Sequence, residues 1–70
     1  LDTSVLQPQV GSLAAALDEA RANAELAQAD YRRAAAVAAS GALSAQEIER
    51  RRSVAIGAEA KVKVAAAQLQ

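Results

Sequence analysis

The feature that most constrains the fold is a pair of apolar stripes that mirror each other about Gly41. Residues 6–38 and 48–69 each carry small or apolar side chains at alternating steps of three and four, the repeat that keeps one helix face turned towards a partner. Arg51 is the one charged residue on these stripes. In an antiparallel pair, positions that meet must add up to a constant, and these add up to 82. The pairs are Leu13 with Leu69, Leu17 with Ala65, Ala20 with Val62, Ala24 with Ala58, Ala27 with Ala55, Tyr31 with Arg51 and Ala34 with Ile48. The sequence therefore predicts an all-α fold, an antiparallel two-helix coiled-coil hairpin.

Signals for a turn lie at the centre of this symmetry. Gly41 follows a run of alanines and can adopt the left-handed conformation that ends a helix. Ser44 stands three residues before Glu47, the spacing of a capping box, in which each side chain accepts a hydrogen bond from the other's backbone N–H. We predict helix 1 over about residues 5–39, a tip over 40–43 and helix 2 over about 44–70, with the start of helix 1 open between about 3 and 8.

The predicted seam is thin, and it is longer on the first helix than on the second. Alanine supplies 21 of the 70 residues, and a buried methyl stabilises much less than a buried Leu or Ile side chain. The first stripe also includes Leu6 and Val10, whose partners would fall near positions 76 and 72. We therefore expect the chain to be a fragment of a longer protein in which the second helix continues.

The residue types argue against most chemistry. The chain has no histidine and no cysteine, and no nucleophile stands beside a base, so we expect no enzyme activity, no metal and no cofactor. Acidic and basic residues balance at eight each. The arginines at 32–33 and 50–52 lack the aromatic neighbours of a nucleic-acid site, so no nucleic-acid partner is expected either. No apolar run approaches the ~20 residues of a transmembrane helix.

Several aliphatic residues fall outside the seam. An isolated hairpin would leave them in contact with water, and the alanine-rich surfaces beside them allow other helices to approach closely. We therefore expect side-by-side packing with further helices. These residues are Leu26, Val37, Leu43, Val54, Ile56 and Val64.

One motif at the turn resembles a known family. Arg33, Val37 and Ser44 have the spacing of the Arg, Leu and Ser at the hairpin tip of periplasmic adaptors, the HlyD-like membrane fusion proteins of Gram-negative tripartite efflux pumps and type I secretion systems. The segments 31–33 and 41–47 around the motif also resemble that tip. Val37 stands where the family has Leu, which removes one methylene from the tip.

The resemblance implies a non-enzymatic periplasmic spacer whose parent chain is anchored to the inner membrane and assembles as a trimer or hexamer. The tip would dock on a TolC-like outer-membrane channel, and the parent would serve an inner-membrane transporter in multidrug or other export. Arms of four to five heptads favour a resistance-nodulation-division pump over an ABC transporter. Arg33 would donate hydrogen bonds to the channel, Val37 would pack in a shallow apolar groove, and Ser44 would hydrogen-bond there.

An alternative of another class remains open, a generic coiled-coil interaction module or a helix lying on a membrane surface. A membrane-surface helix needs one wide apolar face opposite a strongly basic one. This chain instead shows two narrow, mutually matching seams, which argue against the membrane-surface helix.

Overall fold

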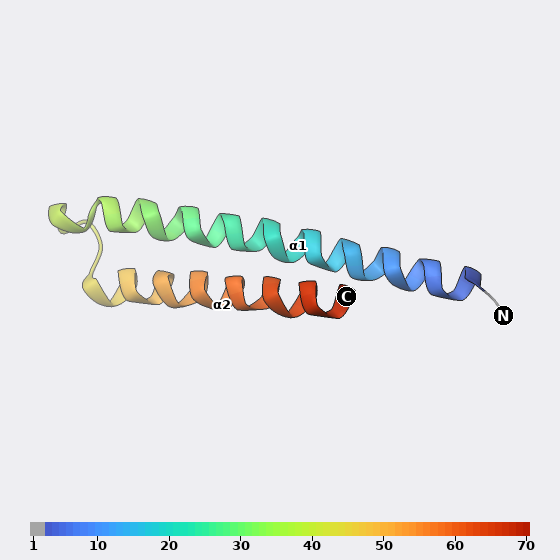
Figure 1. The fold of residues 1–70 in the computed structure, drawn as a ribbon. Coiled ribbons are helices and arrows are strands. Elements are labelled where there is room, and N and C mark those ends of the chain that lie inside the picture. The colour runs from blue at the N-terminus through green and yellow to red at the C-terminus, as the bar shows by residue number, and fades with distance from the viewer. Residues whose placement is uncertain (1–2) are drawn as a thin grey trace.

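The chain forms two antiparallel helices joined by a turn (Figure 1). This computed structural model describes the backbone of residues 3–70 and the side chains of residues 10–70. α1 spans Thr3–Ala36, the short 3₁₀ helix η1 spans Ala38–Ser40, and α2 spans Ala45–Leu69. The molecule is a rod of 62 × 13 × 12 Å. No strand occurs within residues 3–70, and the predicted all-α hairpin is confirmed.

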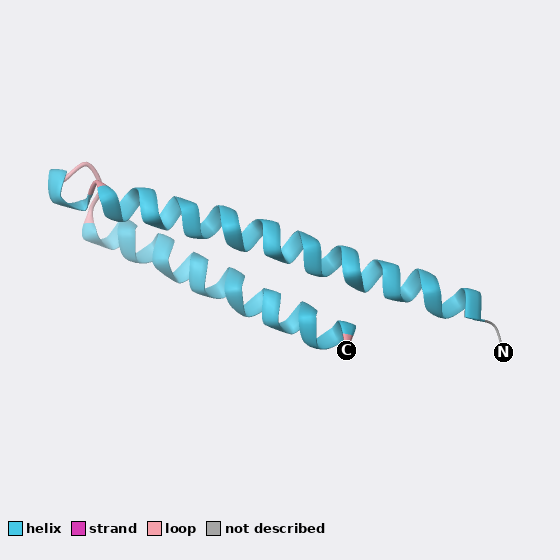
Figure 2. Ribbon diagram, turned by 45° about the horizontal axis from the view of Figure 1, so that its top comes forward, coloured by secondary structure: helices cyan, strands magenta, loops and turns pink. Residues whose placement is uncertain are grey.

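The core is a single thin seam between the helices, which run side by side in both ribbon views (Figures 1 and 2). Most of its buried side chains are alanines, and Ala34 is the most buried, at 1% exposure. Small side chains let the two backbones come close, so the seam depends on the fit of small volumes more than on the area that each residue buries. The buried residues between 10 and 70 all lie on the two stripes: Leu17, Ala24, Ala27, Ala34, Ala55 and Ala65.

The remaining stripe positions are less enclosed, because a two-helix rod has no third layer to cover them. Leu69 is 37% exposed and Val10 is 56% exposed, and the side chain of Leu6 lies outside the described residues. The half-buried positions are Leu13, Ala20, Tyr31, Ile48, Arg51, Ala58 and Val62.

The end of the first helix differs from the predicted one. α1 ends at Ala36 instead of about residue 39, because its last backbone bonds change from the α to the tighter 3₁₀ pattern: Val37 N donates to Ala34 O at 3.2 Å, and Ser40 N donates to Val37 O at 3.1 Å. α1 begins at Thr3, at the early edge of the predicted window. The connection therefore spans residues 37–44 and is longer than the predicted tip over 40–43.

Candidate functional site at the turn end

The candidate site is the turn end of the rod, defined here as residues 30–52. It contains the last two turns of α1, η1, the loop and the first two turns of α2. Five arginines and three carboxylates lie in this segment, so its formal charge is +2. The rest of the described rod, residues 10–29 and 53–69, is called the shaft.

Gly41 reverses the chain. It adopts φ 74° and ψ 11°, the left-handed conformation predicted for it, and its N–H donates to Ala38 O at 3.2 Å. It is the only residue with positive φ among the described ones. The predicted stop signal is therefore used, but it ends η1 rather than α1.

Ser40 fastens the turn from the side of η1. Its hydroxyl donates to Val37 O at 2.7 Å, and the same oxygen accepts from Ala42 N at 3.3 Å. The Ser40 side chain thus adds a second hydrogen bond to the Val37 carbonyl, which already accepts from Ser40 N, and supplies an acceptor for the Ala42 amide. The predicted tip over 40–43 includes Ser40 but not these two hydrogen bonds, although serine beside a glycine is typical of turns.

Ser44 begins α2. Its backbone is extended, with φ −70° and ψ 155°, and its Oγ accepts from Glu47 N at 3.1 Å, which makes it the N-cap. The predicted capping box is only half formed, because the Glu47 carboxylate accepts hydrogen bonds from two arginines instead of reaching back to Ser44. The hydroxyl of Ser44 already accepts, so its hydrogen is what it can offer to a partner.

Glu47 is the electrostatic centre of this end. Its carboxylate accepts from Arg50 Nη2 at 2.8 Å and Nε at 3.1 Å, and from Arg51 Nε at 3.1 Å. Hydrogen bonds from Arg50, and then from Arg51, lower the Glu47 pKa from 4.5 to about 2, and the same bond raises the pKa of the Arg50 guanidinium. Glu47 therefore stays ionised and holds two cations against the first turns of α2.

Two further ion pairs flank this centre. Arg33 Nη2 donates to Asp30 Oδ1 at 2.6 Å on α1, and Arg52 Nη1 donates to Glu49 Oε1 at 3.1 Å on α2. The Arg33 side chain is 68% exposed despite its partner. All ion pairs among the side chains of residues 10–70 lie in the turn end.

The structure places Arg33, Val37 and Ser44 together at this end and leaves all three exposed. Arg33 lies on the last turn of α1, Val37 lies between α1 and η1 with 38% exposure, and Ser44 caps α2. Leu43 beside them is half-buried. The result is a small surface with one exposed aliphatic side chain, one exposed guanidinium and one hydroxyl.

The sequence pairs Tyr31 with Arg51 in the seam, where the ring could lie under the guanidinium, but the structure places the two side chains in different grooves. Arg51 is turned to Glu47 and lines a groove on one flank of the rod, whereas Tyr31 lines a groove on the other flank. The carboxylate four residues back along α2 is the stronger attraction for a guanidinium than a ring face, because it carries a full charge.

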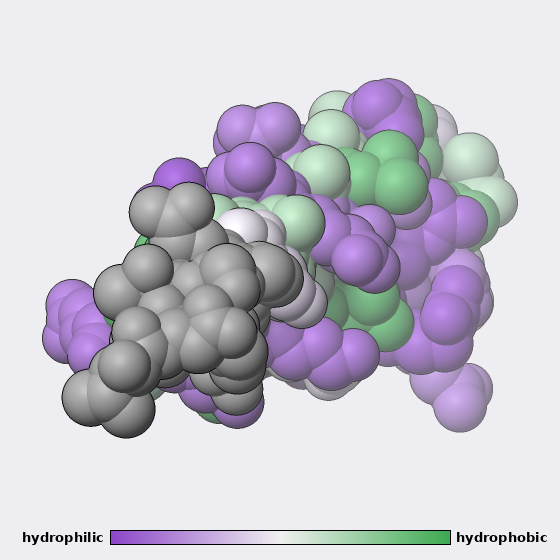
Figure 3. Space-filling model, turned by 90° about the vertical axis from the view of Figure 1, so that its right-hand side faces the viewer, coloured by the Kyte–Doolittle hydropathy of each residue, from purple (hydrophilic) through white to green (hydrophobic). Residues whose placement is uncertain are grey.

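Two further kinds of feature are absent from the described residues. No cluster of three potential metal ligands occurs among the described residues. No helix between residues 3 and 70 is long and apolar enough to cross a membrane. Viewed from the end opposite the turn, apolar patches on the surface are interrupted by polar groups (Figure 3). A search for family models, curated proteins and solved structures similar to the chain found no match.

Proposed function

We propose that this chain is the α-helical hairpin of a periplasmic adaptor in a tripartite efflux pump, and that the turn end docks on a TolC-like outer-membrane channel. The observation that carries the proposal is the exposed arrangement of Arg33, Val37 and Ser44 at the end of a rod, in the spacing of the adaptor tip motif. The parent chain would be anchored to the inner membrane and serve a resistance-nodulation-division transporter.

The arrangement of the turn end suits docking in three ways. The Asp30 carboxylate engages Arg33 through Nη2, which leaves the other guanidinium donors for carbonyls or carboxylates of a partner. Val37 offers an apolar contact of modest area. The caps at Gly41 and Ser44 hold the backbone between them, so the partner meets a preformed surface and little conformational entropy is lost on binding.

The shaft suits a spacer. Its core is a regular seam of small residues. Exposed aliphatic residues along it, such as Leu26 at 60% and Val64 at 57%, are positions where neighbouring hairpins of a trimeric or hexameric assembly would pack.

Site-specific photo-cross-linking tests the docking. A photoreactive amino acid is placed at Val37, or as a control at Leu26, in the full-length protein in the cells that produce it. Both positions carry exposed aliphatic side chains, so they differ mainly in their place on the rod. We expect a cross-link to an outer-membrane channel from position 37 and none from position 26. Capture of the channel from position 26 alone, or from neither position, would refute docking through the tip.

A further inference from the structure

Two shallow grooves run end to end along one flank of the rod. Their volumes are about 330 and 440 Å³, and they form one surface because Ala27 and Val54 line both. Residues three or four positions from a groove residue on the same helix share its face and belong to the same flank. We call this side of the rod the aliphatic flank. Its key residues are Glu19, Leu26 and Asp30 on α1 and Arg50, Val54 and Lys61 on α2.

Most of the exposed aliphatic side chains of the shaft lie on this flank. Leu26 and Val64 are each three residues after a side chain that lines the second groove. Leu26, Val54 and Val64 are 60%, 51% and 57% exposed. Of the exposed aliphatic residues that the shaft carries outside the seam, only Ile56 lies on the opposite flank. The apolar surface that the seam leaves in water is therefore concentrated on one side of the rod.

The two helices carry matching residues on this flank. Positions 19 and 61, 26 and 54, 30 and 50, and 33 and 47 each add up to 80. In three of these pairs the charges are opposite, and in the fourth both side chains are aliphatic. Within one hairpin this match is not used, because no ion pair joins α1 to α2 among the side chains of residues 10–70. It is therefore open to a second copy.

A half-turn about an axis parallel to the rod brings a second copy into this match. The two aliphatic flanks then face each other, α1 of each copy lies over α2 of the other, and both turns lie at the same end. Positions that add up to 82 lie level in the seam, so pairs that add up to 80 are offset by two residues, about 3 Å along the rod. Long charged side chains span that distance. The contacts are Glu19 with the second copy's Lys61, Leu26 with its Val54, Asp30 with its Arg50 and Arg33 with its Glu47.

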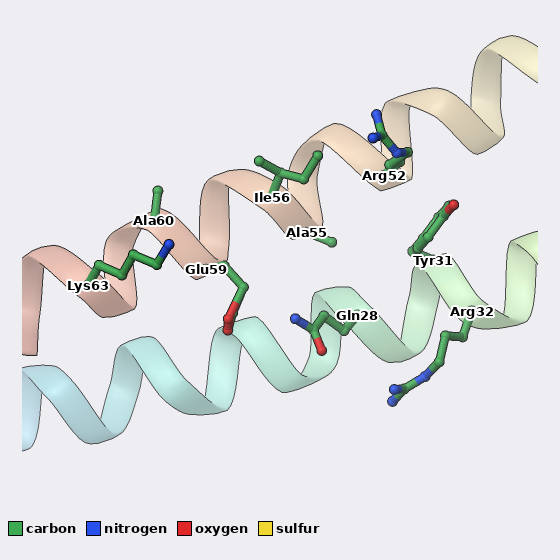
Figure 4. A pocket seen from close by; sticks show the side chains of 9 residues that line it. All are labelled: Gln28, Tyr31, Arg32, Arg52, Ala55, Ile56, Glu59, Ala60 and Lys63. Carbon is green, nitrogen blue, oxygen red and sulfur yellow. The ribbon is translucent and has the colours of Figure 1, made fainter.

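Neither the opposite flank nor reversed rods offer such a match. On the opposite flank, part of which is seen in Figure 4, the same half-turn sets like charges against each other in pairs that each add up to 84. Reversed rods would place α1 on α1 and α2 on α2, where residues of different helices, such as Glu19 and Lys61, cannot meet. Attraction and repulsion between charges thus select one flank and one orientation. The like-charged pairs of the opposite flank are Arg21 with Lys63, Glu25 with Glu59 and Arg32 with Arg52.

We propose that the aliphatic flank is a self-association site, through which two copies of this chain pack as a four-helix bundle with their turns at the same end. Each helix in this bundle is antiparallel to the two beside it, as in bundles with up-down-up-down topology. The interface is isologous, as a two-fold dimer requires. Because both turns lie at one end, the pair suits parent chains anchored in one membrane, and three pairs make a hexamer. This pairing goes beyond the proposed function, since it needs neither a channel nor a transporter.

The charged groups in the shaft part of this flank are available for such contacts. Glu19 and Lys61 are exposed, and neither forms an ion pair with a side chain of residues 10–70. One further cation, Arg51, lines the groove nearer the turn. It falls over position 29 of the second copy, an alanine, so it meets no like charge.

Nearer the turn, the contact extends ion pairs that already exist. Asp30 and Arg50 have partners on their own helices, Arg33 and Glu47, but the side chains of Asp30 and Arg50 remain 47% and 64% exposed. Across the contact, the α1 pair of one copy faces the α2 pair of the other, and each charge lies over one of opposite sign. No existing ion pair has to break for the two copies to meet.

Charge reversal with mixing tests the pairing. Sedimentation equilibrium of the 70-residue chain should show concentration-dependent dimers for the wild type, and association weaker by roughly tenfold for E19K or K61E alone, because two ion pairs become like-charge contacts. An equimolar mixture of the two variants should associate as the wild type does, since opposite charges meet again between copies. E25K is the matched control, at an exposed glutamate of the opposite flank, and should leave the association unchanged. Circular dichroism checks that each variant keeps its helix content.

The orientation is tested by disulfide trapping, since the natural chain has no cysteine. L26C is mixed with V54C, or with I56C as the control, and a tag on one variant separates mixed dimers from the others on a gel. Val54 and Ile56 are 51% and 54% exposed on the same helix but lie on opposite flanks. Mixed dimers with V54C should form roughly tenfold faster than those with I56C, because only position 54 lies close enough to position 26 of the second copy for a disulfide.

Four results would overturn the pairing. They are a wild type that stays monomeric up to millimolar concentration, equal association of the wild type and E19K, equal trapping rates at positions 54 and 56, and L26C that links fastest to itself, as reversed rods would require. Both tests use the chain without a channel and change shaft residues only. A failure here and a failure of docking at the turn end are therefore separate results.

Discussion

The turn end and the shaft differ in where their interactions lie. In the turn end, hydrogen bonds and ion pairs join residues two to four positions apart, and every ion pair between residues 10 and 70 is found there. Five of the six buried side chains lie in the shaft, in the seam between the two helices. Charged residues of the shaft such as Asp18 and Lys61 have no ion-pair partner among the described side chains.

The difference teaches which substitutions each region tolerates. The shaft depends on volume at the seam, so residues of the right size can replace one another. The turn end depends on particular atoms, a glycine without a Cβ, a hydroxyl that caps and a carboxylate that holds two arginines. This division is consistent with the proposed docking tip on a spacer.

The largest expected effect is in the shaft. Replacing Leu17, 7% exposed, with alanine removes the largest buried side chain of the seam. We expect the free energy of unfolding to fall by about 2 kcal/mol, the lower end of the usual cost of Leu→Ala, because two helices can partly close the gap. Leu26→Ala is the matched control, since Leu26 is 60% exposed. Chemical denaturation measures both, and equal losses would mean that the seam is not the core.

The next comparison uses two glycines with opposite expected signs. Gly41→Ala should destabilise the hairpin by about 1 kcal/mol, because φ 74° disfavours a side chain even though an added Cβ would meet nothing within 4 Å. Gly57→Ala in the shaft should stabilise it by about 1 kcal/mol, since this glycine is in a helix interior with the same open space. Shifts of the same sign in thermal melts would contradict the assigned conformation of Gly41.

A similar contrast holds for two serines on α2. Ser44→Ala removes the N-cap acceptor and should cost about 1 kcal/mol, whereas Ser53→Ala within the helix should stabilise it by a few tenths of a kcal/mol. Amide hydrogen exchange at Glu47 should rise in the Ser44 variant alone, because that amide loses its acceptor. Unchanged exchange there would show that Ser44 does not cap α2 in solution.

The smallest effect is the pH dependence carried by Glu47. Its pKa of about 2 in the folded chain lies below the ordinary value of 4.5, so its ionised form stabilises the fold above the ordinary value and this contribution disappears as pH falls towards 2. Melting temperatures between pH 5 and pH 2 should therefore fall less in Glu47→Gln than in the wild type. Glu19→Gln in the shaft serves as the control. If the melting temperatures of both variants fell with pH as steeply as those of the wild type, Glu47 would not carry this pH dependence.

The sequence was sufficient for the fold because the fold is periodic. Stripes that mirror each other about Gly41 leave one antiparallel register, and all the buried side chains lie on those stripes. The end of α1 was wrong by three residues, because alanines are compatible with both α and 3₁₀ turns and the choice depends on the Ser40 hydroxyl and its partner carbonyl at Val37.

The details of the turn end were less predictable because several partners compete for the same groups. The spacing of Ser44 and Glu47 predicts a reciprocal cap. It does not show that Arg50 and Arg51 donate hydrogen bonds to the Glu47 carboxylate. Likewise the seam register placed Arg51 near the Tyr31 ring and the helix placed it near the Glu47 carboxylate. Its guanidinium donates to the carboxylate. Sequence spacing shows which groups can meet, whereas the balance of their interactions decides which do.

We propose that the turn end docks on the channel, whereas the shaft holds it at a distance and packs against neighbouring hairpins. The most direct measurement is export-dependent drug resistance in cells that carry the full-length protein with Arg33→Asp, beside Arg21→Asp as the shaft control. Both positions are exposed arginines on α1, and immunoblots confirm equal expression. The account predicts that resistance is lost with Arg33→Asp and kept with Arg21→Asp. Resistance that persists in both variants would contradict it, and the molecule would then be a helical hairpin without a docking tip.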